Sequence, residues 1–302
     1  MIPNDKELKL ISIYLYVCKQ YETELKYVCQ RYSNNSQPKF SDQEIMTIYL
    51  FATDQQRYFS IKEIHTFARE YLHSWFPELP SYQQFSDRIN KLCGVFQHIS
   101  LRLLEGFLSE DCDLGISLTD SFPIVTCKGR NRKGRVAPEL TDKGYCSTKN
   151  LYYYGMKLHA LTFKRKGRIP FPEQLLCTSA SVNDLDAFKQ AWGDTIANRT
   201  VFGDKIYLDK NYFDIRHESN NLTMLTPIKL VKGESEEIRK REKAYRDLYS
   251  AAVSSVRQPI ESFFNWLNEK TSIQRASKVR SAKGLLLHIF GRIAAAFIHL
   301  IF

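Results

Sequence analysis

The spacing of apolar residues in this chain changes from helical to strand-like near Leu114, and this change limits the possible folds most strongly. Before it, two Ser-x-x-Glu sequences, which begin at Ser41 and Ser60, predict capping boxes at the starts of helices. After it, apolar and polar residues alternate over residues 151–163, which is typical of a strand with two different faces.

The strand-like segments also suggest how a sheet would form. We expect a helix over residues 182–194 and strands over residues 115–127, 151–163, 175–181, 200–204 and 222–228. Three hairpin-like strands followed by alternating helix and strand predict a mixed sheet with helices outside it. The expected fold class is therefore α/β, with an all-helical N-terminal region over residues 1–112 and a sheet domain over residues 113–302.

Composition excludes several classes of protein. A hydrophobic content of 43% is enough for a folded core and excludes wholesale disorder. The seven cysteines form no Cys-x-x-Cys pair, which argues against a disulfide scaffold or a zinc ribbon and favours a cytoplasmic protein. The N-terminus lacks the basic-then-apolar order of a signal peptide. Residues 284–302 are the only candidate membrane span, but Arg292 and two histidines within them favour a buried helix.

The net charge of +10 is concentrated in two parts of the chain. Residues 128–168 hold 12 Lys and Arg against 2 Asp and Glu, and residues 228–302 hold 14 against 7, whereas residues 1–119 hold 12 against 15. Such focused positive charge favours a polyanionic partner, although solvated surface loops remain an alternative. The run KGRNRKGR predicts a cationic loop on the DNA backbone, with five basic residues: Lys128, Arg130, Arg132, Lys133 and Arg135.

Three acidic residues lie in three different settings. Asp120 and Asp204 each follow a short apolar strand-like run, and Glu261 follows Pro259 in an aromatic, helical segment. If the two strands are parallel neighbours, both aspartates emerge at the same edge of the sheet, and a divalent metal would relieve their repulsion. Two strand-end aspartates and a helix glutamate are suited to holding two Mg²⁺ ions on a phosphodiester. Any one of these acids, taken alone, also fits an ordinary surface residue.

Several fragments, in order, resemble the bacterial insertion-sequence transposases of the DDE type, and most closely the group named for insertion sequence nine-eighty-two. They are SYQQFSDRIN, LTDSFPI, KGYCSTKNLYYYGMKLHAL, SASVNDLDAF, FGDKIY, LTPIK and RQPIESFFNWL. The resemblance implies an RNase H-like core and a DNA transposase with Asp120, Asp204 and Glu261 as catalytic metal ligands. It also implies two Mg²⁺ ions, with Mn²⁺ as a substitute, and a homodimer on terminal inverted repeats and target DNA, in the bacterial cytoplasm at the nucleoid.

The chain departs from the Tyr-x2-Arg-x3-Glu-x6-Lys signature of related transposases. Arg257 holds the arginine position, but Ser254 replaces the tyrosine and Asn268 the lysine, so that Lys270 is the candidate substitute. Because Pro259 favours a first helical position, we expect Arg257 in a loop that contacts DNA, rather than on the face of Glu261.

Other expectations concern DNA contacts. Lys157 and His159 share a strand face and are candidate phosphate contacts, although a core histidine is a close alternative. The N-terminal helices fit a helix-turn-helix or a plain bundle. Two further functions remain open: an RNase H-like nuclease or resolvase that does not join strands, and a non-catalytic DNA-binding protein.

Overall fold

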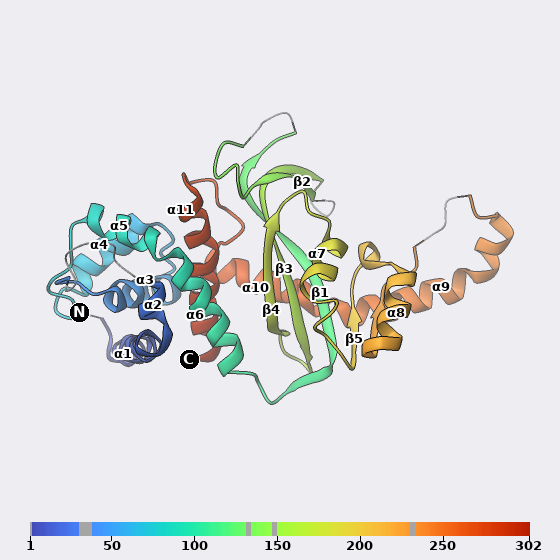
Figure 1. The fold of residues 1–302 in the computed structure, drawn as a ribbon, viewed down its shortest axis with the longest axis horizontal. Helices are drawn as coiled ribbons and strands as arrows, with labels where there is room; N and C mark the ends of the chain where they lie inside the picture. Colours follow the sequence, from blue (N-terminus) through green and yellow to red (C-terminus); the bar gives the residue numbers. More distant parts are fainter. Residues whose placement is uncertain (1, 30–37, 131–133, 147–149, 230–232) are drawn as a thin grey trace. The chain divides into compact units, whose positions relative to one another are not determined.

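A computed structural model describes residues 2–29, 38–130, 134–146, 150–229 and 233–302 (Figure 1). It divides the chain into two compact units. The helical unit comprises Met1–Phe107, Arg135–Glu139 and Leu267–Phe302, and the sheet unit comprises Leu108–Gly134 and Leu140–Trp266. The segment from Leu267 onward thus groups with the N-terminal helices, whereas the sequence-based division placed it with the sheet.

Capped helices build most of the helical unit. Its elements are α1 (Asn4–Gln20), η1 (Tyr21–Leu25), α2 (Lys26–Val28), α3 (Asp42–Gln56), α4 (Ile61–Tyr71), α5 (Tyr82–Lys91), α6 (Cys93–Gly106), α11 (Ala282–Leu286), η3 (Leu287–Gly291) and α12 (Arg292–Ile301). The predicted capping boxes at Ser41 and Ser60 are confirmed, and Ser81 forms a third one. Each cap satisfies backbone N–H groups that would otherwise lack partners.

The C-terminal helix, Ala282–Ile301, is the one helix in the described part of the chain that is long and apolar enough to cross a membrane. It is nevertheless 67% buried over its apolar window, and its α12 segment packs on α3 and α6. The guanidinium of Arg292 donates hydrogen bonds to the carbonyl oxygens of Thr271, Ser272 and Phe59 at 2.8, 2.8 and 3.1 Å. The prediction of a buried core helix is confirmed.

The sheet unit contains a mixed six-stranded sheet, in the order β2-β3-β1-β5-β6 with β4 also paired to β3. The strands are β1 (Cys112–Lys128), β2 (Asp142–Cys146), β3 (Leu151–Arg165), β4 (Phe171–Ser179), β5 (Arg199–Phe202) and β6 (Leu222–Leu225). The first four pair antiparallel, and β1, β5 and β6 pair parallel. This topology is consistent with an RNase H-like fold and confirms the expected fold class. The short strand β2 was not among the strands expected from the sequence.

Helices pack on both faces of this sheet. The helices that follow β4 are α7 (Asp184–Ala191), η2 (Lys205–Tyr207), α8 (Lys210–Asn220), α9 (Glu236–Arg257), which extends away from the sheet, and α10 (Pro259–Thr271) (Figure 1). On one face, Leu161 packs with Phe188 and Trp192 around α7. On the other, the ring of Phe122 stacks on Phe264 of α10 at a centroid distance of 5.2 Å. Because side chains alternate along a strand, Asp120 shares the face of Phe122, while Ser121 shares the face of Leu161.

Candidate active site

The register of β1 and β5 brings the two aspartates to the same end of neighbouring strands. The parallel pairing ends with Leu118 opposite Phe202, and each aspartate lies two residues further along its own chain. The condition stated for a shared edge, that the two strands are parallel neighbours, is therefore met. Asp120 does not end its strand as expected, because β1 continues to Lys128 through its antiparallel pairing with β3.

Asp204 begins the turn that follows β5. Its Oδ1 accepts a hydrogen bond from the backbone N of Ile206 at 2.8 Å and so caps the short helix η2. A Cβ on the preceding Gly203 would lie 2.8 Å from the ring of Tyr207, so only glycine lets the chain turn this tightly. The turn fixes one carboxylate oxygen of Asp204 and leaves Oδ2 without a hydrogen bond from any described residue.

Glu261 lies in the first turn of α10. Four apolar side chains of the helix are buried: Ile260, Phe263, Phe264 and Leu267. The side chain of Glu261 itself is 54% exposed. The helix therefore holds a carboxylate at the surface, directly beside the sheet face that carries Asp120.

Arg257 joins two of the three acids. Its Nη1 donates to Asp120 Oδ2 at 2.7 Å, and its Nη2 donates to Glu261 Oε1 at 2.6 Å. The expectation that Arg257 lies in a loop and contacts only DNA is wrong. Arg257 is the last residue of α9, and Gln258 keeps helical dihedral angles before α10 begins at Pro259. The two helices thus follow each other without a loop, which places Arg257 one turn before Glu261.

The surroundings of Asp120 and Asp204 disfavour negative charge, so the pKa of each carboxyl is raised. Burial raises the pKa of Asp120 to about 6, against the lowering effect of Arg257, and the nearby charges of Asp204 and Asp184 raise it further. Burial likewise raises the pKa of Asp204. Burial acts to lower the pKa of Arg257, but Asp120, Glu261 and Asp204 together raise it above its usual value. Arg257 is therefore the positive charge shared by all three candidate ligands.

The donor set fits a hard divalent cation in its chemistry. Mg²⁺ and Mn²⁺ prefer carboxylate oxygens, and all three candidate ligands are carboxylates. Buried carboxylates with raised pKa values also gain from a cation that neutralises them. Within the described part of the chain, however, no three acidic, histidine or cysteine side chains are gathered closely enough to hold a metal. In this structure the guanidinium of Arg257 supplies the bridging positive charge.

Lys157 and His159 lie on the other face of the sheet, away from Asp120. Lys157 Nζ donates to Asp184 Oδ1 at 2.8 Å, and Ser121 Oγ donates to Asp184 Oδ2 at 2.9 Å. His159 is 1% exposed, and burial lowers its pKa to about 4, so it is neutral near pH 7. This placement favours a structural network over DNA contacts. The side chain of the neighbouring Asn183 caps α7.

None of the remaining candidate DNA contacts that the structure describes forms an ion pair with the three acids. Lys128 and Arg130 are exposed, and Arg130 lies over the ring of Tyr152 at 5.5 Å. Arg135 is exposed in the helical unit, while Arg132 and Lys133 lie outside the described residues. Lys270 follows Glu261 by nine residues, which turns it by about 180° around α10, so Lys270 does not take the signature lysine's place on the face of Glu261.

Sequence reasoning missed the double contact of Arg257 and the network around Asp184. The four-residue spacing of Arg257 and Glu261 was a usable signal, since such pairs meet on a helix. The contact with Asp120 joins residues far apart in the sequence and had no local signal.

Comparison with known proteins gives one result that bears on this site. A family model described as Transposase DDE domain matches residues 112–298, which include all three acids and Arg257. No curated protein and no solved structure matches the chain significantly.

Proposed function

Because the chain belongs to the DDE transposase family, we propose that it cleaves DNA at transposon ends and transfers the cut strands into target DNA. The observation that carries this proposal is that the guanidinium of Arg257 donates to both Asp120 and Glu261 and also interacts electrostatically with Asp204. The fragments quoted above further favour the group named for insertion sequence nine-eighty-two. Two copies of the chain would act together on the two paired ends of the transposon.

The proposed chemistry divides between metal and protein. Divalent cations, when bound, activate the attacking water or DNA 3′-hydroxyl and stabilise the leaving 3′-oxygen. Asp120 and Asp204 hold their oxygens at one end of two paired strands, and Glu261 adds a carboxylate from α10. Arg257 keeps Asp120 ionised despite its burial, because its charge opposes the rise in the pKa of that carboxyl. Lys128 and Arg130 are available for the DNA backbone.

The test uses duplex DNA that carries the terminal repeats flanking the gene, with Mg²⁺ or Mn²⁺. We expect Asp120→Asn, Asp204→Asn and Glu261→Gln each to lower the cleavage rate by at least about 100-fold, because each removes a charged metal ligand. Asp186→Asn is the matched control, since Asp186 is an exposed acid on α7. Near-normal cleavage by one of the three variants would remove that residue from the site.

A second assay separates a transposase from a nuclease of the same fold. Precut ends with a free 3′-hydroxyl are mixed with plasmid DNA, and joined products are measured. A transposase joins them, whereas a nuclease or resolvase only cuts. Cleavage without joining would therefore reduce the proposal to a metal-dependent nuclease.

A further inference from the structure

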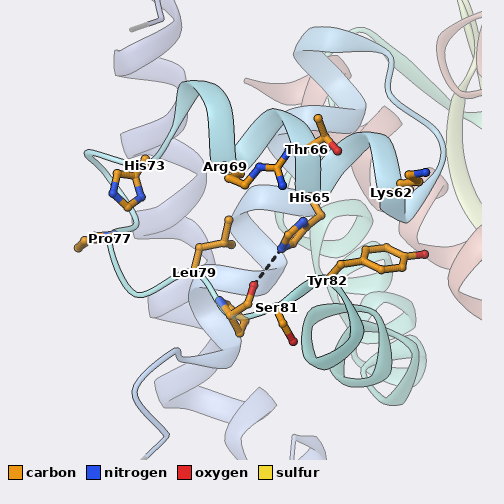
Figure 2. A pocket seen from close by; sticks show the side chains of 10 residues that line it. Lys62, His65, Thr66, Arg69, His73, Pro77, Leu79, Ser81 and Tyr82 are labelled. Carbon is orange, nitrogen blue, oxygen red and sulfur yellow. Dashed lines mark hydrogen bonds between the residues drawn. The ribbon is translucent and has the colours of Figure 1, made fainter.

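Two cavities in the helical unit share Lys62 and Tyr82 among their lining residues. The first, of about 540 Å³, lies between α4 and the segment that leads to α5, where Figure 2 shows Lys62, Arg69 and Tyr82 around it. The second, of about 710 Å³, is also lined by the segment of residues 272–281 that precedes α11. We call the two cavities together the basic groove.

Positive side chains dominate the lining of the groove. The exposed cations are Lys62, Arg69, Arg275, Lys278 and Arg280. Among the lining residues, Glu63 is the single acid, and its carboxylate already accepts hydrogen bonds in the capping box of α4. The groove is therefore strongly basic, although residues 1–119 have a net charge of −3 by count. The segment of residues 272–281 supplies three cations and no acid, which explains the difference.

Most of these cations are available for a ligand. Within the described part of the chain, Lys62, Arg275 and Lys278 form no ion pair, and Arg69 has only an exposed contact with Glu70 at 3.8 Å. Glu63 interacts electrostatically with Lys278, but its single charge offsets only part of the charge of the five exposed cations, so an anion in the groove would lower the free energy of the arrangement.

Two further features of the groove favour phosphate. Helices α4 and α5 begin at its wall with the caps Ser60 and Ser81, so the positive ends of two helix dipoles lie there. Tyr82 is 46% exposed and presents an aromatic ring and a hydroxyl group to the same space. Tyrosine hydroxyl groups are among the donors that contact phosphate oxygens in protein–DNA complexes.

We propose that the basic groove binds the phosphate backbone of duplex DNA. The inference rests on the proposed function, which requires the chain to hold DNA. The cations are spread over two cavities and come from two segments far apart in the sequence. That distribution suits a polyanion with regularly spaced phosphates better than one small anion. The contacts are to the backbone, so they add affinity without selecting a sequence.

The test compares two triple variants of the full chain. The groove variant, Lys62→Ala/Arg275→Ala/Lys278→Ala, removes three lining cations that form no ion pair. Lys19→Ala/Lys39→Ala/Lys91→Ala removes the same charge from exposed lysines of the helical unit that do not line it. Binding of a fluorescein-labelled duplex of arbitrary sequence is followed by anisotropy at increasing salt concentrations. Thermal unfolding of both variants, and the three single groove variants, control for folding.

We expect the groove variant to bind at least about tenfold more weakly, with a log–log salt slope reduced by about 2 to 3, and the control to change little. Each single groove variant should reduce the slope by about 1. Equal losses in both triple variants, an unchanged groove variant, or a wild-type chain that does not bind the duplex would each overturn the inference. A wild-type chain that binds through the groove but cuts no DNA with metal would instead overturn the proposed function alone.

Discussion

Replacing Arg257 with lysine tests the double contact that joins Asp120 and Glu261. A lysine ammonium keeps the charge but lacks the planar fork that donates to both carboxylates at 2.7 and 2.6 Å. A charge-assisted hydrogen bond contributes about 1.5–3 kcal/mol, and exposure of 54% at Glu261 reduces the lost bond to roughly 1–1.5 kcal/mol. We therefore expect Arg257→Lys to cleave about tenfold more slowly.

Alanine at the same position removes both bonds. The contact with Asp120 is better shielded, since the two side chains are only 16% and 23% exposed, so the total loss should be about 3 kcal/mol, or roughly 100-fold in rate. Single-turnover cleavage measures both variants, with Arg239→Lys, an exposed position on α9, as the control. The pH profile is a second readout. Arg257 lowers the pKa of Asp120, so its loss should move the acid limb of activity to higher pH.

Two results would refute this reasoning. If Arg257→Lys cleaved within about twofold of the wild type, the fork would have no role in the reaction. If Arg257→Ala lost activity with an unchanged pH profile, Arg257 would act on DNA alone, as the sequence first suggested.

Two further predictions concern stability. Asp184→Asn should destabilise the protein by about 2–4 kcal/mol, because it leaves Lys157 without its charged partner, while DNA binding persists. Urea unfolding measures the change in the free energy of unfolding. A loss below about 0.5 kcal/mol would show that the ion pair contributes little to stability. Burial lowers the pKa of His288 to about 3, below the unfolded value of about 6.5, so stability present above pH 6.5 should fall as the pH drops toward 3, by at most about 1.4 kcal/mol per unit. His288→Gln should flatten this dependence in unfolding curves at pH 7, 5 and 4, and an unchanged slope would contradict it.

The sequence was sufficient where short-range patterns decide the structure. Capping boxes at Ser41 and Ser60 and the alternation over residues 151–163 predicted helices and a strand that the structure contains. That Asp120 and Asp204 would share one edge was expected only on the condition that their strands are parallel neighbours, which the register shows them to be.

The sequence was insufficient where distant segments meet. The preference of Pro259 for a first helical position was read correctly, but it does not reveal that α9 ends directly against it. Alternation placed Lys157 and His159 on one face but did not show that α7 covers that face.

The same limit applies to charge. Counting residues over 1–119 indicated an acidic N-terminal region, yet the segment of residues 272–281 returns to the helical unit and makes one wall of it basic. The basic surface forms only when segments far apart in the sequence fold together, so a charge count over one continuous stretch of the chain does not reveal it.

The register between β1 and β5 also determines which changes in chain length the protein can tolerate. Extra residues in the turn between β3 and β4 leave Leu118 opposite Phe202, so Asp120 and Asp204 keep their places. One extra residue between Leu118 and Asp120 would turn Asp120 to the opposite face of the sheet, toward Asp184. Between α9 and α10, one added residue would rotate Glu261 by about 100° away from Arg257. Relatives of this chain should therefore vary freely in their outer turns and keep constant length at these two short segments.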